Sequence, residues 1–283
     1  MKSKRSITSV ILSLALALSL CLGLTACGSD GAGDAGSSGD GKASYTVGIC
    51  QLVQHEALDA ATQGFIDALN EALPGQVKFE NKNASGDSVN CSTIVNGFVS
   101  ENVDLIMANA TGALTAAASA TKDIPILGTS ITAYGVALDI DDFSGTVGGN
   151  ISGTSDLADL SKQADMITEW FPETKTVGLL FCSGEPNSRY QIEEVAKCLA
   201  AKGIETKEFA FTDTNDVSSV TQAAADYSDV VYIPTDNTAA SNTEAIANVL
   251  VPAGVPAICG EEGICKGCGV ATLSISYYDL GVT

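Results

Sequence analysis

Residues of the kinds that bind small molecules follow most of the short apolar runs in this 283-residue chain. Carboxylates, amides, hydroxyls and the chain's one histidine recur at these places, with one alanine offering its backbone N–H. The candidate ligand-binding residues are His55, Asp87, Asn109, Ala110, Thr111, Thr129, Ser130, Asp156, Glu185, Asn187, Ser188, Asp236, Asn237 and Glu261. Taken alone, most are simply explained as helix caps or turn residues. Taken together, the set predicts a polar binding site.

Catalytic chemistry has little support in the sequence. There is no GxSxG motif, and no Ser or Cys is visibly paired with His55 as nucleophile and base. The adjacent carboxylates Glu261-Glu262 and Asp141-Asp142 are poor glycosidase pairs, because consecutive residues of a helix or strand point apart. No GxGxxG, GxxxxGKS or GxxxxGKT motif follows a strand-like run. We therefore expect a binding protein that is not an enzyme and uses no cofactor.

The elements that would position these residues alternate along the chain from Tyr45 onward. The first series predicts strands at 45–53, 76–83, 103–109 and 124–130, and helices at 56–73, 90–100 and 112–123. The alternation stops over 134–155, which is rich in Gly and Asp. The second series predicts helices at 156–170, 187–202, 216–226 and 238–250, and strands at 174–183, 204–211, 228–235 and 255–260. Such alternation is typical of βα units around a parallel sheet.

We interpret the two series as two similar α/β lobes, each with a doubly wound parallel sheet, and a ligand cleft between them. The predicted bounds are 45–150 for the N-terminal lobe, 151–275 for the C-terminal lobe and 276–283 for the start of a return crossing to the first lobe. Two independent Rossmann-like domains on a linker are the alternative. Ligands of open parallel sheets bind outside the carboxyl ends of the strands, so the polar residues of the two lobes would face each other.

The N-terminal stretch predicts a signal peptide and a lipid anchor. Lys2, Lys4 and Arg5 precede an apolar run that is shorter than the roughly 20 residues a membrane-spanning helix needs. The residues Leu24-Thr25-Ala26-Cys27 resemble the lipobox of bacterial lipoproteins, in which the cysteine is lipidated after cleavage. We expect a signal peptide at 1–26, then lipidated Cys27 and a disordered Gly/Ser-rich tether over 27–44. An ordinary cleavage site with an incidental cysteine is the alternative.

The charge of the chain limits the classes of partner that it can bind. The formal net charge is −20, and the predicted signal peptide contributes only positive charge, so the remainder is still more acidic. That field disfavours nucleic acid and anionic lipid surfaces as partners.

Besides Cys21 and Cys27, seven cysteines remain, an odd number that rules out a complete disulfide framework. The CKGC motif at Cys265–Cys268 leaves a redox pair, a local disulfide and half a zinc site open.

Six segments together resemble the substrate-binding lipoproteins of ABC importers of the tryptophan/tyrosine type. They are QHEALDAATQGF, TKDIPIL, GTSD, TKTVGLL, YIPTDNT and GEEG followed by ATLSISYYDLG, and they cover Tyr45 to Gly281 in order. The resemblance implies a periplasmic-binding-protein-like fold of class I that closes on one amino acid, chiefly an aromatic one. It also implies an ABC permease as membrane partner, an extracytoplasmic location, and further chain after YYDLG, whereas this sequence ends at Thr283.

An amino acid is a zwitterion, so a closing cleft must match both of its charges. Helix starts at Ala110-Thr111-Gly112 and hydroxyls at Thr129-Ser130 suit its carboxylate. For the ammonium group we expect a carboxylate of the facing lobe, Asp236 first and Glu185 second. His55 could stack on an aromatic ring or merely bound the cleft.

Two other functions remain open from the sequence. A nucleoside or sugar receptor is the first, although sugar sites usually stack the ring on Trp and Trp170 has the spacing of a core or helix-end residue. A ligand sensor for a membrane signalling protein is the second.

Overall fold

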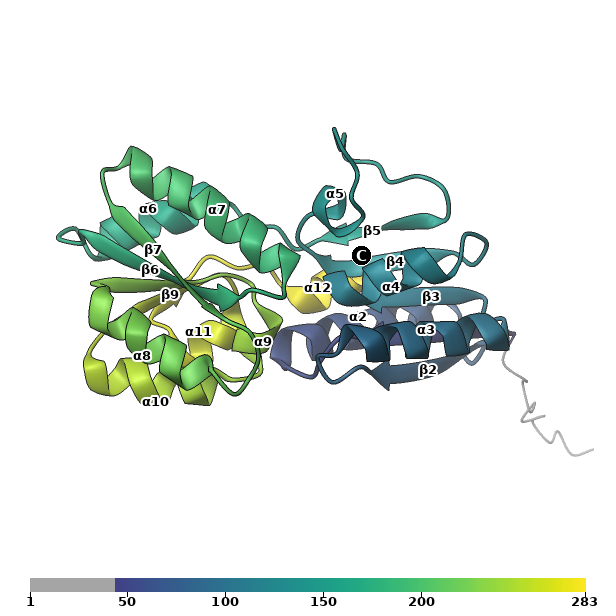
Figure 1. Cartoon of the computed structure of the whole chain (residues 1–283). Coiled ribbons are helices and arrows are strands. Elements are labelled where there is room, and N and C mark those ends of the chain that lie inside the picture. The colour runs from purple at the N-terminus through teal and green to yellow at the C-terminus, as the bar shows by residue number, and fades with distance from the viewer. Residues whose placement is uncertain (1–43) are drawn as a thin grey trace, which may run out of the picture. The chain divides into compact units, whose positions relative to one another are not determined.

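The computed structural model describes residues 44–283. The predicted signal peptide, Cys27 and all but the last residue of the tether lie outside the described residues. Two parallel sheets of five strands each organise the remainder (Figure 1). We call the first sheet with its helices the first lobe, and the second sheet with its helices the second lobe.

The first sheet has the strand order β2-β1-β3-β4-β5. Its strands are β1 Tyr45–Gln51, β2 Val77–Asn83, β3 Leu105–Asn109, β4 Ile126–Ile131 and β5 Ile151–Ser155. The helices of this lobe are α2 Glu56–Ala72, α3 Ser88–Glu101, α4 Thr111–Ala120 and the short α5 Tyr134–Ala137.

The second sheet has the order β10-β9-β8-β6-β7, which is the same topology as the first when the strands are counted from β6. Its strands are β6 Thr176–Cys182, β7 Glu205–Phe211, β8 Val230–Ile233, β9 Ala257–Cys259 and β10 Ala271–Thr272. The helices that follow the first sheet in sequence are α6 Leu160–Trp170, α7 Pro186–Ala201, α8 Val217–Tyr227, α9 Asn237–Ala240, α10 Thr243–Ala253, α11 Glu262–Cys268 and α12 Tyr277–Val282.

Each sheet is covered on both faces, which is why its central strands are almost continuously apolar. In the second lobe, Leu180 and Val231 pack against one set of helices, and Leu179 and Tyr232 belong to a separate apolar cluster on the other side. The first lobe likewise has two clusters around its sheet. The predicted α/β fold with two doubly wound lobes is confirmed.

Helix α12 returns to the first lobe and packs on α2 (Figure 1). Gly64 of α2 and Gly281 of α12 face the backbone of the opposite helix so closely that a Cβ atom on either would collide with it. The hydroxyl of Tyr278 also donates to a carboxylate oxygen of Asp67 at 3.0 Å. These contacts make α12 part of the first lobe.

Several boundaries differ from the expected ones. Strand β5 pairs with β4, so the first sheet extends beyond residue 150 to Ser155. The expected helix at 238–250 is two helices, because the chain turns at Asn242, whose side-chain amide donates to the backbone carbonyl of Thr238 at 2.7 Å. Trp170 ends α6 and is 57% exposed, so it is a helix-end residue and not a core residue. None of the helices within 44–283 is long and apolar enough to cross a membrane.

Candidate functional site

A small polar cavity, here called the inner cavity, lies where the two lobes meet. It measures about 10 Å³, which is room for roughly one water molecule. Its wall contains residues that follow the strands of both sheets, as well as a tyrosine from the return crossing. The lining residues are His55, Leu58, Ser130, Thr132, Asp156, Asn187, Thr235, Asp236, Asn237, Ala240, Glu261 and Tyr277.

Three polar atoms of the inner cavity are buried without a hydrogen-bond partner among the described residues. They are Oγ of Ser130, one carboxylate oxygen of Asp156 and Oγ1 of Thr235. An unsatisfied buried polar group costs about 1–3 kcal/mol. Three of them around one cavity indicate a site in which a polar ligand would supply the missing partners.

Asp156 follows β5 directly and is fully enclosed. Its second carboxylate oxygen accepts a hydrogen bond from the hydroxyl of Tyr277 at 2.9 Å. Burial raises the pKa of Asp156, and the contacts with the side chains of Tyr277 and Thr132 work in the opposite direction. The Tyr277 hydroxyl therefore holds the carboxyl group in place while leaving its other oxygen facing the cavity.

The two acids that the sequence favours for an ammonium group are already engaged by backbone N–H groups. Asp236 accepts from the N–H of Cys182 at 2.6 Å and from that of Ala239 at 2.8 Å. Glu185 accepts from the N–H groups of Asn237 and Thr238 at 2.9 and 2.8 Å. Burial, and then the nearby charge of Glu185, raise the pKa of Asp236 to about 8.

Two polar contacts join the lobes, one beside the inner cavity and one at the surface. Nε2 of His55, which precedes α2, lies 3.2 Å from Oδ1 of Asn237. Burial lowers the pKa of His55, so the neutral ring is favoured near neutral pH. At the surface, Lys266 of α11 forms an ion pair with Glu56 at 2.5 Å. Both contacts require the lobes to be close together.

A second and larger space, the outer cavity, adjoins the inner one. It has a volume of about 650 Å³ and shares Asn187 and Asn237 with the inner cavity. Its remaining wall combines an apolar part with hydroxyl and amide groups. The lining includes Leu52, Val53, Ser85, Ser88, Thr111, Gly112, Ala116, Glu185, Pro186, Thr212, Asp213, Thr214, Thr238 and Asn242.

Helix α4 begins at this outer cavity without a side-chain cap. The residue before it, Ala110, is buried and has a φ of 85°, a conformation that costs energy for a residue with a side chain. Ser130, the second-last residue of β4, has a φ of 56°. Strained backbone of this kind clusters at binding sites. Uncapped N–H groups at a helix start favour an anionic ligand group.

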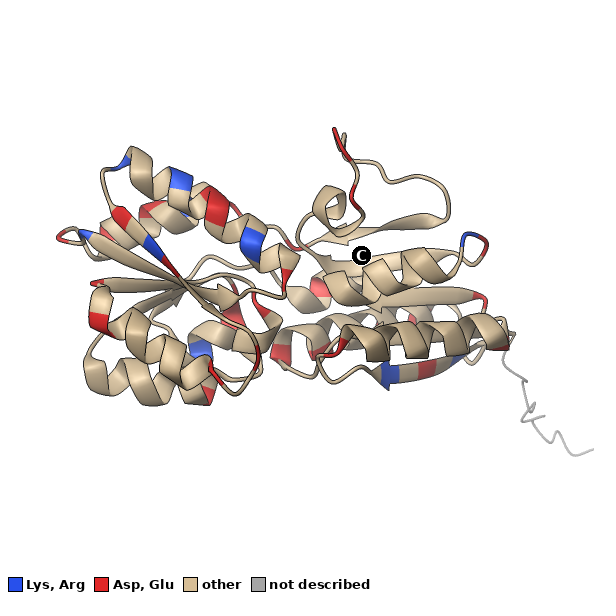
Figure 2. Cartoon of the chain, in the orientation of Figure 1, with Lys and Arg blue, Asp and Glu red and all other residues tan. Residues whose placement is uncertain are grey.

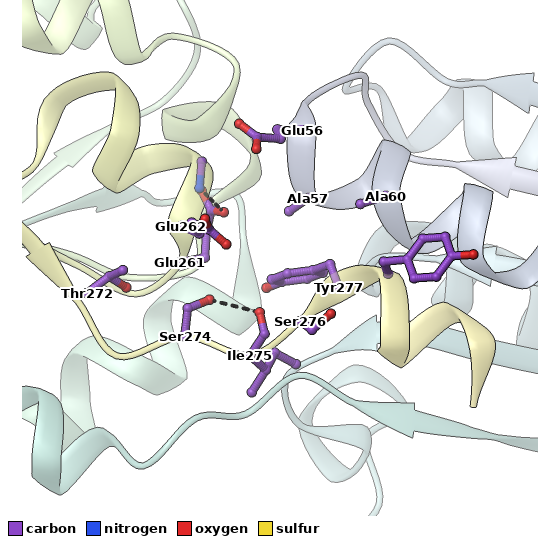
Figure 3. A pocket seen from close by; sticks show the side chains of 12 residues that line it. Glu56, Ala57, Ala60, Glu261, Glu262, Thr272, Ser274, Ile275, Ser276 and Tyr277 are labelled. Atoms are coloured by element: carbon purple, nitrogen blue, oxygen red, sulfur yellow. Dashed lines mark hydrogen bonds between the residues drawn. The ribbon is translucent and has the colours of Figure 1, made fainter.

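A third space, the crossing cavity, lies between α2 and the return crossing and measures about 410 Å³. Figure 3 shows Ala57 and Ala60 on the α2 side and Glu261 and Glu262 on the other, with Tyr277 pointing between them. Glu261 caps α11 by accepting from the N–H groups of Gly263 and Ile264. It lines both the crossing cavity and the inner cavity.

Seven predicted site residues line the inner cavity, and two more line the outer cavity only. The first group is His55, Ser130, Asp156, Asn187, Asp236, Asn237 and Glu261, and the second is Thr111 and Glu185. The others, Asp87, Asn109, Ala110, Thr129 and Ser188, line neither.

The structure gives these five residues other contacts. Asp87 caps α3 through the N–H of Val89, and the side-chain amide of Asn109 donates to the carbonyl of Leu58 at 2.8 Å. Oγ1 of Thr129 lies 3.2 Å from that of Thr154, within the sheet. Ser188 is fully buried beside Asn187, and Ala110 precedes α4.

Sequence reasoning missed three polar residues of the inner cavity. Thr132 follows β4 at two residues from Ser130, and Thr235 stands beside Asp236, so both could have been found by extending each strand-end set. Tyr277 could not, because its position depends on the return crossing. Within residues 44–283, no group of three or more His, Cys, Asp or Glu side chains is arranged to hold a metal ion.

Comparison with known proteins gives a consistent picture. The model of a family described as ABC transporter substrate binding protein matches residues 46–283. A protein named tyrosine-binding protein, from Clostridioides difficile (strain R20291), is 31% identical over 286 residues, which is 99% of this chain and 81% of that protein.

Two solved structures are similar at nearly equal sequence identity. The first, an ABC domain from Streptococcus pneumoniae in complex with L-Trp, is 30% identical with a TM-score of 0.81, over 85% of this chain and 82% of that one. The second is the ligand-free, open structure of a substrate-binding protein with adhesive properties from Clostridium difficile. It is 32% identical with a TM-score of 0.60, over 84% of this chain and 81% of that one. Residues 44–283 are thus arranged more like the ligand complex than like the open form.

Proposed function

Because this chain belongs to the ABC transporter substrate-binding proteins, we propose that it captures one free amino acid, an aromatic one, between its two lobes. The match to the family model and to the tyrosine-binding protein confirms the family and the binding role that the sequence indicates. Proteins of this family are extracytoplasmic and deliver their ligand to a membrane permease. Lipid attachment at Cys27 is part of the proposal. The proposal gives the chain no catalytic step.

The observation that carries the proposal is the carboxylate oxygen of Asp156 in the inner cavity that has no hydrogen-bond partner among residues 44–283. A ligand ammonium group would donate to it and, by its positive charge, would favour the ionised carboxylate. Asp236 and Glu185 are weaker candidates, since their oxygens already accept backbone N–H groups. The ammonium partner would then lie next to the first lobe, rather than on the facing lobe as the sequence suggests.

The ligand carboxylate would be held by the first lobe as well. The free hydroxyl of Ser130 lines the inner cavity, and the uncapped start of α4 at Thr111 lies at the outer cavity. Anions bind well at such helix starts because the N–H groups point at them. The second lobe would add Thr235 and Asn237 only on closure. Closure then follows from contacts that exist in the closed state alone.

The ligand side chain would extend toward the outer cavity, whose volume of about 650 Å³ falls within the usual range for ligand sites. Leu52, Val53 and Ala116 supply apolar surface there. An aromatic side chain buries about 150–250 Å², worth about 4–6 kcal/mol. Micromolar binding needs about 8 kcal/mol after association costs. The polar contacts must therefore contribute.

Two relatives support the choice of an aromatic ligand. One, 31% identical, is named for tyrosine, and the other, 30% identical, was solved with L-Trp. The small inner cavity fits a closed conformation that has to open before a ligand can enter. The exposed position of Trp170, outside the three cavities, gives no support to stacking of a sugar ring.

Calorimetric titration against L-Tyr, L-Trp, L-Phe, aliphatic amino acids, nucleosides and sugars tests the ligand class. Binding of aromatic amino acids is expected. In Asp156→Asn, which keeps an acceptor for Tyr277, the loss of a buried charged partner should weaken binding by about 2–5 kcal/mol, roughly 30-fold to several thousand-fold in Kd. The matched control is Asp226→Asn, an exposed carboxylate on α8. Binding of nucleosides or sugars alone would overturn the ligand class, and unchanged affinity in Asp156→Asn would overturn the role of Asp156.

Lipid attachment has its own test. Replacement of Cys27 by Ser in cells fed a labelled fatty acid should abolish labelling and release the protein from the membrane fraction. Labelling that persists in the variant would contradict the anchor without affecting the ligand proposal.

A further inference from the structure

Three cysteines of the second lobe gather around the end of β9 and helix α11. Cys259 ends β9 and is fully buried, while Cys265 and Cys268 lie on α11 and are partly exposed. All three side chains pack in one apolar cluster. Cys259 and Cys265 lie beside each other, because a Cβ atom on Gly269 would collide with both the sulfur of Cys259 and the Cα of Cys265. The thiol of Cys268 donates instead to the backbone carbonyl of Ile264 at 3.3 Å. None of the seven cysteines in residues 44–283 is in a disulfide.

The three thiols are not equivalent. The hydrogen bond with Cys259 lowers the pKa of Cys265 to about 7, while the same contacts and burial raise the pKa of Cys259. A partly exposed thiol that ionises near neutral pH is the kind that attacks disulfides. Cys265 has the access and Cys259 is the neighbour it touches.

The other cysteines lack this combination. Cys50 of β1 and Cys91 of α3 also contact each other, but both are fully buried. Cys198 of α7 is partly exposed, but no hydrogen bond joins it to another described cysteine. Cys182 is buried, and its thiol is directed at the carbonyl of Thr212.

We propose that Cys265 and Cys259 form a thiol-oxidation site, closed by a disulfide that ties the end of β9 to α11. The segment between them contains Glu261, which caps α11 and lines the inner cavity. Lys266, the next residue after Cys265, forms the ion pair with Glu56 of the first lobe. The disulfide would therefore fix the part of the second lobe that contacts both the ligand cavity and the opposite lobe.

The reaction needs a disulfide as oxidant, and oxidised glutathione is the probe. The Cys265 thiolate attacks one sulfur of oxidised glutathione, so a Cys265–glutathione bond forms, the glutathione disulfide breaks and one glutathione thiolate leaves. The Cys259 sulfur then attacks the Cys265 sulfur, a Cys259–Cys265 bond forms, and the second glutathione leaves with the proton from Cys259. Two protein thiols are oxidised and one small disulfide is reduced.

Intact-mass measurement and peptide mapping after incubation with oxidised glutathione test the proposal without reference to any ligand. The wild-type protein should lose the mass of two hydrogen atoms, and the disulfide should map to Cys259–Cys265. The initial rate should rise with pH and reach half of its plateau near the Cys265 pKa of about 7.

Variants separate the steps. In Cys259→Ser the reaction should stop after the first step, with one glutathione retained on Cys265. Cys265→Ser should lose the reaction, and Cys268→Ser and Cys198→Ser should keep it. Far-ultraviolet circular dichroism checks that each variant is folded, and Cys265→Ala repeats the test if Cys265→Ser is not.

Three results would overturn the proposal. The first is a disulfide that maps to Cys265–Cys268. The second is a Cys265→Ser variant that is oxidised as fast as the wild type. The third is no reaction of the folded wild-type protein under conditions in which the urea-unfolded protein reacts.

Discussion

Helices α4 and α5, which follow the third and fourth strands of the first lobe, have no side-chain cap, whereas carboxylates cap their counterparts α9 and α11 in the second lobe. The strand orders of the two sheets are the same, so the difference lies in the residues that follow the strands. Glu185, Asp236 and Glu261 all point at backbone N–H groups of their own lobe. The first lobe keeps Ser130 and the start of α4 without such partners.

The comparison shows how one topology can serve two tasks. Carboxylates at helix starts stabilise the second lobe and satisfy its own donors. The same positions in the first lobe are left free, which costs stability and creates a place for a ligand. Figure 2 shows that α4 carries no charged side chain, whereas its second-lobe counterpart α9 and helix α11 begin after acidic residues. A polar residue that follows a strand therefore caps a helix in the second lobe, whereas in the first lobe it can be left free for a ligand.

The largest effect is expected when a second-lobe cap is removed. Glu185→Ala would leave the buried N–H groups of Asn237 and Thr238 without their acceptor. We expect a loss of about 2–4 kcal/mol in the free energy of unfolding, measured by urea denaturation. Glu193→Ala, on the exposed face of α7, is the matched control and should change stability by less than about 0.5 kcal/mol. Equal stability of the two variants would break the comparison.

A pH effect of the second lobe comes next. The pKa of Asp236 is raised to about 8 in the folded state, so the folded protein binds more protons than the unfolded chain between about pH 4 and pH 8. Deprotonation of Asp236 therefore costs more free energy in the folded protein than in the unfolded chain. The free energy of unfolding should fall between about pH 5 and pH 8 by up to about 1.4 kcal/mol per pH unit. Urea denaturation across this range should show a shallower fall in Asp236→Asn. Identical slopes would contradict the assignment.

The smallest of these effects belongs to the first lobe and concerns binding instead of stability. Ser130→Ala removes a hydroxyl that has no partner among residues 44–283, so the free energy of unfolding should not fall. Ligand affinity should drop by about 0.5–1.5 kcal/mol, roughly 2- to 12-fold in Kd. Ser100→Ala on the exposed side of α3 should change neither quantity. If Ser130→Ala destabilises the fold while binding is retained, the hydroxyl is structural, like the caps of the second lobe.

Much of the fold was predictable from the alternation of apolar runs and helical patterns. Strands β1 to β4 and β6 to β9 form near the expected positions. The central ones are short apolar runs buried on both faces, whereas the edge strands β2 and β7 are more polar and partly exposed. Strand β5, with the sequence ISGTS, has too few apolar residues to be recognised. The two-residue β10 and the short α11 and α12 follow tertiary contacts more than local pattern.

The candidate site was predictable only in part. Ser130, Asp156 and Asn187 lie beside the inner cavity, because parallel strands bring their carboxyl ends to one edge. The direction of a side chain is a different matter. Asn109 also ends a strand, yet its amide points into the lobe and bonds to α2. Sequence spacing likewise does not show that Asp236 and Glu185 already accept hydrogen bonds from backbone N–H groups, because these contacts depend on the folded geometry.

The packing of α12 on α2 also affects the order in which the molecule can form. The hydrogen bond from Tyr278 to Asp67 joins residues 211 positions apart in the sequence. During synthesis, the strands of the first lobe are complete long before α12 exists, so the face of α2 that α12 covers stays exposed while the entire second lobe is made. Contacts of such long sequence separation slow folding. The first lobe starts folding first and finishes last, and its α2 surface is where a chaperone or an aggregating neighbour would bind the unfinished chain.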